Sequence, residues 1–297
     1  MSNRENYLNG FFEEFGYPKE ARESLLRAAK LTEGRPEIEK YLKEYRETGK
    51  TDHGKALDEA GRLAGTVGLS PYETQFLLYL LLSEPLLDRY RAAGISRDIW
   101  HDSMDDLRCK LFECYRMYGI WGSFVAAWFP RFFEMTRFAL GRLQFENYDI
   151  DEDYPAFGLK KGDTVVNMHI PSRGKLPHEA VTDSCKRAYD FYPQYRRNGV
   201  LPLFCHSWLL YPRHEEFLPE GSNILAFQRD FDITRWGESK VFDDAWRVYY
   251  ADAGKKPEDL PTDTPLRAAY TAWLRQGNRA GWGQGFILFD GEKGIKP

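Results

Sequence analysis

The turn at residues 171–176 carries the clearest chemical signal in this chain. Thr164–Ile170 has the branched and apolar residues of a β-strand, and His178–Tyr192 has the apolar spacing of an amphipathic helix. The sequence PSRGKL lies between them. Such a turn directs several backbone N–H groups toward one point, where the positive end of the helix adds to them. The segment therefore predicts a pyrophosphate site, with Arg173 and Lys175 able to add positive charge.

A second interpretation of this turn requires no ligand. Gly174 permits a tight turn, and the basic pair Arg173 and Lys175 is solvated. The two interpretations differ in one consequence. A bulky residue at position 174 should abolish phosphate binding under the first, whereas under the second the turn has no phosphate site to lose.

Three residues in predicted strands carry side chains that can hold a proton or a metal ion: Glu146, His169 and His206. Side chains alternate faces along a strand, so His206 and Ser207 point in opposite directions and cannot form a nucleophile–base pair. Two histidines and one carboxylate also match a known type of metal site, although nothing in the spacing requires one. A hydrogen-bonded structural role for each histidine is the remaining alternative.

The elements that would position these residues change in character near residue 135. Upstream, prolines open runs with helical apolar spacing, and residues 70–73 (SPYE) combine an N-cap serine, an early proline and a capping-box glutamate. No convincing strand precedes Gly122. We therefore predict an all-helical N-terminal domain over residues 1–134.

Downstream of residue 135, predicted strands and helices alternate, which indicates an α/β or α+β domain over residues 135–297 with a mixed sheet flanked by helices. The predicted strands are Thr136–Asp149, Thr164–Ile170, Leu201–Leu210, Asn223–Ile233 and Phe286–Asp290. The predicted helices are His178–Tyr192, Phe242–Asp252 and Pro265–Gln276.

Composition limits the partners and the compartment. The chain has 41 Lys and Arg against 45 Asp and Glu, a net charge of −4 that gives no overall attraction to nucleic acid or acidic lipid. The longest apolar run, Phe76–Leu82, is too short to span a bilayer, and the N-terminus has no secretory signal. Four cysteines fit neither a disulfide framework nor a zinc pattern. We expect a cytoplasmic protein with reduced thiols and neither nucleic acid nor membrane as a partner.

The segments LGRLQFE, HIPSRGKL and CHSWLL, together with the order of the domains, resemble a family of bacterial N-acyltransferases with a helical N-terminal domain and a GNAT-like C-terminal domain. The resemblance implies a mainly antiparallel sheet and acyl-CoA, either acetyl-CoA or a longer thioester, as co-substrate. The acyl-CoA would enter a cleft between the strand that ends at His169 and Ile170 and the strand at Cys205–Leu210. The implied cofactor-binding residues are Ile170, Ser172, Arg173, Gly174, Lys175 and Leu176.

Catalysis in such a family implies a base that takes a proton from an acceptor amine and an acid for the departing CoA thiolate. The candidate bases are His206, His169 and Glu146, and the candidate acid is Tyr211. The expected reaction is direct attack, in a ternary complex, by a small-molecule or peptide amine. Acceptor identity, acyl length and oligomeric state are not encoded in any motif we find.

A non-catalytic protein is the alternative function. A GNAT-shaped domain could bind a nucleotide-like ligand, a peptide or a protein partner without turnover. Such a protein would tolerate alanine at Glu146, His169 and His206 without losing its ligand.

Overall fold

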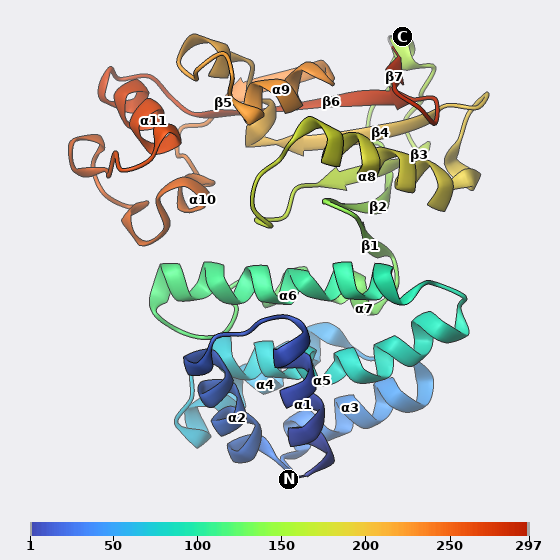
Figure 1. The fold of residues 1–297 in the computed structure, drawn as a ribbon, viewed down its shortest axis with the longest axis vertical. Coiled ribbons are helices and arrows are strands. Elements are labelled where there is room, and N and C mark those ends of the chain that lie inside the picture. The colour runs from blue at the N-terminus through green and yellow to red at the C-terminus, as the bar shows by residue number, and fades with distance from the viewer. Residues whose placement is uncertain (1, 296–297) are drawn as a thin grey trace. The chain divides into compact units, whose positions relative to one another are not determined.

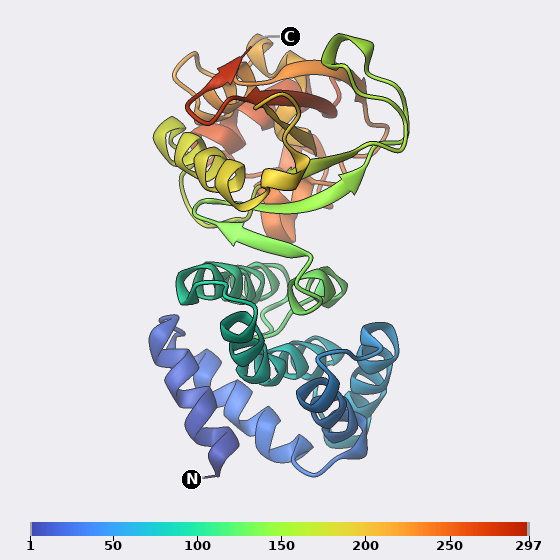
Figure 2. The same cartoon turned by 90° about the vertical axis from the view of Figure 1, so that its right-hand side faces the viewer.

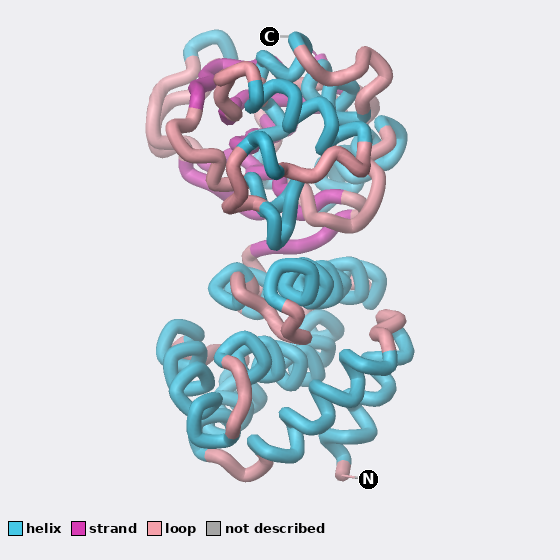
Figure 3. Tube along the Cα trace, turned by 90° about the vertical axis from the view of Figure 1, so that its left-hand side faces the viewer, coloured by secondary structure: helices cyan, strands magenta, loops and turns pink. Residues whose placement is uncertain are grey.

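A computed structural model of the chain describes residues 2–295, which form two compact units, one up to Phe138 and the other from Ala139 onward. Figure 1 labels the helices and strands of both units. Coloured by secondary structure, the first unit is helical and the second contains the strands (Figure 3). None of the described helices is both long and apolar enough to cross a membrane.

The N-terminal unit confirms the predicted all-helical domain. Helix α5 has the capping box predicted at residues 70–73, and most of its side chains from Phe76 to Leu86 are buried against the other helices. Within the described residues, no strand precedes Arg137. The helices are α1 (Asn3–Glu14), α2 (Lys19–Thr32), α3 (Pro36–Thr48), α4 (His53–Val67), α5 (Pro71–Ala92), α6 (Arg97–Tyr118) and α7 (Pro130–Phe133).

The C-terminal unit is built on a mixed sheet in the order β1-β2-β3-β4-β6-β5, with β7 paired to β6. The strands β3 and β4 are parallel, and the pairs β2–β3, β4–β6, β5–β6 and β6–β7 are antiparallel, as expected for the predicted α+β class. The strands are β1 (Arg137–Leu140), β2 (Leu143–Asp149), β3 (Thr164–His169), β4 (Leu201–Ser207), β5 (Asp232–Glu238), β6 (Gly281–Phe289) and β7 (Gly294–Ile295).

The two faces of this sheet have different coverings. Helix α8 (His178–Phe191) buries Val181, Ser184, Cys185 and Ala188 and lies beside β2 and α9 (Asn223–Arg229). Figures 1 and 2 show α8 lying along the sheet. A core cluster that includes Val165, Phe204 and Phe286 belongs to the other face. The remaining helices are α10 (Ala245–Tyr249) and α11 (Pro265–Arg275).

Three predicted strands need correction. Thr136–Asp149 is a hairpin and not one strand, because Gly141 adopts a φ of 77° that turns the chain between β1 and β2. Leu201–Leu210 ends at Ser207, where the Ser207 hydroxyl accepts a hydrogen bond from the N–H of Leu209 and begins a 3-10 turn. The last strand begins at Gly281 and not at Phe286.

The predicted strand Asn223–Ile233 was wrong. Its first part is helix α9, and β5 begins only at Asp232. Ser222 caps the helix by accepting a hydrogen bond from the N–H of Ile224, and helical spacing buries Leu225 and Gln228. Tertiary packing of this face prevails over the strand-forming residues of the segment.

Candidate active site

A carboxylate and a histidine meet on the sheet face opposite α8. Antiparallel pairing of β2 with β3 sets Glu146 across from Asn167 and Gln144 across from His169, so Glu146 and His169 are diagonal neighbours. The His169 Nε2 atom lies 2.7 Å from Glu146 Oε1. Glu146 is 4% exposed, whereas the His169 side chain is 22% exposed. The pair thus combines a buried carboxylate with an imidazole that reaches the surface.

The pairing determines which ring nitrogen is basic. An ionised carboxylate only accepts hydrogen bonds, so the Nε2 atom of His169 carries the proton and donates it to Glu146. The amide of Asn167 lies 3.3 Å from the same nitrogen and flanks the ring. Nδ1 is then the basic atom of a neutral His169, and Glu146 can stabilise the cation that forms when Nδ1 takes up a proton.

The strands β3 and β4 separate next to this pair. Their register holds only at Val166↔Leu203 and Asn167↔Phe204. Beyond Phe204, β4 stays paired with β6 alone, with Cys205 opposite Gly285 and Ser207 opposite Gly283. A gap in the parallel ladder therefore opens beside His169, at the end of β3 from which the chain enters the turn at 171–176.

His206 lies on the same face as His169. Val165 of β3 and Phe204 of β4 belong to the same core cluster and so face the same side of the sheet. His169 follows Val165, and His206 follows Phe204, by an even number of residues, so both histidines face that side as well. The His206 ring is 4.8 Å from the ring of Trp282 on β6. Burial lowers the pKa of His206, Asp244 opposes this shift and Arg235 adds to it, so His206 is neutral at neutral pH.

Tyr211 is separate from this group. Its ring packs where a side chain at Gly281 would project, and Gly281 faces the opposite side of β6 from Trp282. Its hydroxyl donates to Glu238 at 3.3 Å, and burial raises its pKa. The structure therefore places Tyr211 apart from Glu146 and His169. The acid role of Tyr211 stays a prediction.

The predicted phosphate turn is braced by an arginine that sequence reasoning missed. The Arg142 guanidinium donates to the carbonyl oxygens of Gly174 and Lys175, each at 3.0 Å. The hydroxyl of Ser184 on α8 accepts from the N–H of Arg142 at 2.8 Å and so positions the arginine. Arg142 directly follows Gly141 in the β1–β2 turn, but no sequence signal links it to a segment over thirty residues away.

This bracing orients several N–H groups outward. In a trans peptide the C=O and N–H point in opposite directions, so carbonyls held by Arg142 direct the N–H groups of Lys175 and Leu176 away from it. These two, and the first two N–H groups of α8, at His178 and Glu179, have no acceptor among the described residues. Gly174 has a φ of 78°. The turn and the helix end together form a row of donors suited to an anion.

Two family models divide the chain between them. The GNAT-like C-terminal domain matches residues 138–287, and the N-acyltransferase N-terminal domain matches residues 6–135. The chain belongs to the N-acyltransferase family with a GNAT-like C-terminal domain. The comparison with curated proteins found no match.

Solved structures with the same fold include acyltransferases in complex with ligands. An acyltransferase with decanoyl-CoA and teicoplanin is 20% identical, with a TM-score of 0.71 over 95% of this chain and 87% of that chain. A mutant acyltransferase with octanoyl-CoA is 20% identical over the same shares, with a TM-score of 0.72. An acyltransferase with decanoyl-CoA is 22% identical, with a TM-score of 0.69, again over 95% and 87%. These likenesses establish the fold.

In this member of the N-acyltransferase family, some of the residues predicted from the sequence come together in the structure and others do not. Glu146 and His169 are in contact, and His206 shares their face on the neighbouring strand. No group of three His, Cys, Asp or Glu side chains suited to a metal ion occurs within residues 2–295. The cofactor-binding candidates Ile170, Ser172, Arg173, Gly174, Lys175 and Leu176 follow β3 directly and lead through Pro177 into α8.

Proposed function

We propose that this protein is an acyl-CoA-dependent N-acyltransferase. The observation that carries the proposal is the combination of a match to the GNAT-like family model with a gap between β3 and β4. The Glu146–His169 pair lies at one side of this gap and the donor row at the turn follows it in sequence. A thioester in the gap would have a base beside it and an anion site for its pyrophosphate.

The donor we propose is a medium-chain acyl-CoA. Two acyltransferases of similar structure hold octanoyl-CoA and decanoyl-CoA. The N–H groups of Lys175, Leu176, His178 and Glu179 would bind the pyrophosphate, and the Arg173 and Lys175 side chains would add charge. The facing edges of β3 and β4, whose mutual register ends at Asn167 and Phe204, would bind the amide groups of the pantetheine arm beyond that point.

The acceptor we propose is an amine on a small molecule or a peptide-like compound. One acyltransferase of similar structure binds teicoplanin together with decanoyl-CoA. His206 and the neighbouring Trp282 and Arg235 lie on the same sheet face as His169 and would line the approach of the acceptor. Glycopeptides such as teicoplanin therefore belong among the first amines to test.

In the proposed reaction, the neutral amine nitrogen attacks the thioester carbonyl carbon. A C–N bond forms, the C–S bond breaks, and CoA leaves as the thiolate. Nδ1 of His169 takes the proton from the attacking nitrogen, while Glu146 holds Nε2–H and stabilises the imidazolium. The proton then passes to the thiolate, so that the products are an amide and free CoA. His206 is the second candidate base, and Tyr211 stays the candidate acid.

We also propose the division into a helical domain, residues 1–134, and an acyltransferase domain, residues 135–297, and a cytoplasmic location. The two family models meet between residues 135 and 138, close to that division. The four cysteines are unpaired and buried, which fits a reducing compartment.

Titration calorimetry with CoA, octanoyl-CoA and decanoyl-CoA tests the cofactor site. The wild type should bind all three, and Gly174→Trp should bind each at least about tenfold more weakly. A side chain at Gly174 meets no atom within 4 Å, but its φ of 78° strains any other residue, so this variant disturbs the turn and spares the core. Absence of binding by the wild type would refute the acyl-CoA assignment.

A further inference from the structure

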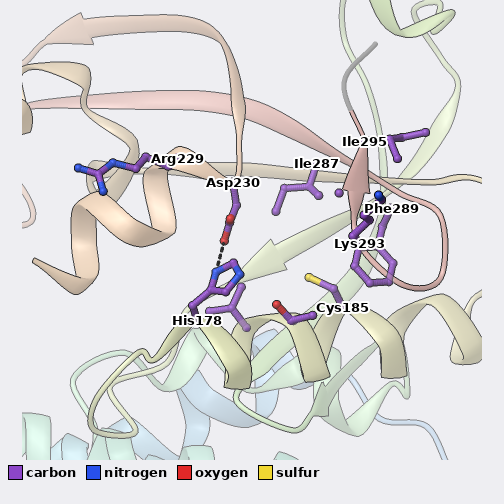
Figure 4. Close-up of a pocket in the computed structure, with 11 residues that line it drawn as sticks. His178, Cys185, Arg229, Asp230, Ile287, Phe289, Lys293 and Ile295 are labelled. Atoms are coloured by element: carbon purple, nitrogen blue, oxygen red, sulfur yellow. Dashed lines mark hydrogen bonds and ion pairs between the residues drawn. The ribbon is translucent and has the colours of Figure 1, made fainter. Parts of the chain in front are cut away.

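A pocket lies on the sheet face covered by α8. It is formed by His178, Val181 and Cys185 of α8, by Ile287 and Phe289 of β6, and by Lys293 in the turn before β7. Its volume is about 290 Å³, near the lower end of the range of small-molecule sites. Figure 4 shows the side chains of these residues around it.

This pocket is separate from the Glu146–His169 pair, and it shares His178 with the donor row at the turn. Ile287 and Phe289 alternate with Phe286, so they face away from the core cluster that carries Val165 and Phe204. The register places Ile287 opposite Leu203 and Phe289 opposite Leu201, at the beginning of β4. The gap between β3 and β4 opens at the other end of β4, beyond Phe204.

The lining has an apolar middle and polar ends. Val181, Ile287 and Phe289 are buried hydrocarbon, and burial raises the pKa of the Cys185 thiol, which keeps it neutral. At one end the His178 Nδ1 atom lies 3.1 Å from Asp230 Oδ2, the contact marked in Figure 4. This contact joins the start of α8 to the residue that follows α9 and closes that end.

An exposed cation, Lys293, lies at the other end, near the Asp290 carboxylate, whose pKa it helps to lower. The Lys293 ammonium has no hydrogen-bond or ion-pair acceptor within residues 2–295. The backbone of its turn is held, because the Asp290 carboxylate accepts from the backbone N–H groups of both Glu292 and Lys293 at 2.9 Å. Arg229 is a further unpaired cation at the rim, and Figure 4 shows its side chain directed away from the other labelled residues.

We propose that this pocket binds a small amphipathic carboxylate, with its hydrocarbon part between α8 and β6 and its carboxylate on Lys293. A 150 Å³ apolar cavity holds a benzene molecule, so about 290 Å³ accommodates a straight-chain or aryl carboxylate of roughly eight carbons. An apolar floor with one cation at its end selects a monoanion over an amine of the same length.

Calorimetric titration with sodium octanoate, in the absence of CoA, tests this proposal. The wild type should bind one octanoate and should not bind octylamine. Lys293→Glu should weaken binding at least about tenfold, since it replaces an attraction by a repulsion. Lys186→Glu, an equal charge change at an exposed position of α8 outside the pocket, should leave binding unchanged.

A second variant locates the bound octanoate. Thr182→Trp fills the pocket from α8 and should abolish octanoate binding while decanoyl-CoA binding persists. Circular dichroism would check that Thr182→Trp folds. If it does not fold, the octanoate affinity of Lys293→Glu, which changes a surface side chain, tests the location alone. Three results would overturn the proposal. They are no octanoate binding by the wild type, wild-type octanoate affinity in both Lys293→Glu and Thr182→Trp, or displacement of octanoate by saturating CoA. Failure of the acyl-CoA assignment would leave the octanoate result intact.

Discussion

Single residues determine the chemistry in this account, and the contact between Glu146 and His169 is the most specific of them. Both were predicted as candidate bases from their strands. Their contact was not predictable, because it depends on the register of β2 against β3, which neither strand encodes alone. Arg142 was missed for the same reason. Its partners Gly174 and Lys175 are distant in sequence and meet it only in the folded chain.

Replacing Glu146 by Gln should reduce the turnover number roughly 100-fold. The glutamine amide can donate to Nε2 of His169, which moves the ring proton to Nδ1, and it no longer stabilises the imidazolium. The binding constant for decanoyl-CoA should stay within about twofold. Steady-state release of free thiol, with the exposed Glu215→Gln as the matched control, measures this. An unchanged turnover number would remove Glu146 from the mechanism.

Acid sensitivity should trace in part to His214. Its side chain is fully buried with Nε2 bonded to the Tyr270 hydroxyl, and burial lowers its pKa to about 4. Between pH 6.5 and 4 the unfolded chain binds a proton that the folded chain does not, so stability falls as pH falls. The loss is on the order of 3 kcal/mol. Urea unfolding at pH 7 and pH 4.5 should show a smaller difference for His214→Gln, and an equal difference would exclude this residue as the cause.

At the scale of elements, local signals worked where caps and periodicity agree. The capping box of α5 and the amphipathic pattern of α8 were read correctly. Prediction failed in Asn223–Arg229, where strand-forming residues form a helix because of tertiary packing. It also failed at Gly141, which divides an alternating segment into a hairpin. The predicted last strand, Phe286–Asp290, also left out the glycines at the start of β6, which lie within the strand.

Gly283→Ala should lower the free energy of unfolding by at least about 2 kcal/mol. A Cβ atom there would lie 2.1 Å from the carbonyl oxygen of Leu210, so either β6 or the 3-10 turn after β4 must shift. The matched control is Gly254→Ala, where the added carbon meets nothing within 4 Å. Chemical denaturation of both variants compares them. Equal stabilities would mean that the close approach of Leu210 is not required.

Arg142→Ala should weaken CoA binding roughly tenfold without unfolding the protein. Without the guanidinium, the carbonyls of Gly174 and Lys175 are free to rotate, and the N–H groups that point outward lose their common direction. Arg91→Ala removes an exposed arginine of the N-terminal unit and should leave CoA affinity unchanged. Calorimetry of both variants decides; wild-type affinity in Arg142→Ala would show that the turn needs no brace.

At the scale of the whole molecule, two observations agree: a helical unit precedes a mixed-sheet unit, and the matched family models follow the same order. This organisation was predictable because the change from helical periodicity to alternating strands and helices is visible near residue 135. Acceptor identity was not, because the proposed acceptor site would be formed by side chains such as His206, Trp282 and Arg235, which come together from three strands.

The most direct test of the central claim is thiol release from decanoyl-CoA in the presence of a panel of amines, teicoplanin among them, followed by mass spectrometry of the products. We expect one amine to gain the mass of a decanoyl group as CoA is released, and His169→Ala to react roughly 100-fold more slowly at unchanged decanoyl-CoA affinity. Acylation at the wild-type rate by His169→Ala would contradict the assigned base. Wild-type protein that binds decanoyl-CoA but acylates no amine would contradict the proposed activity.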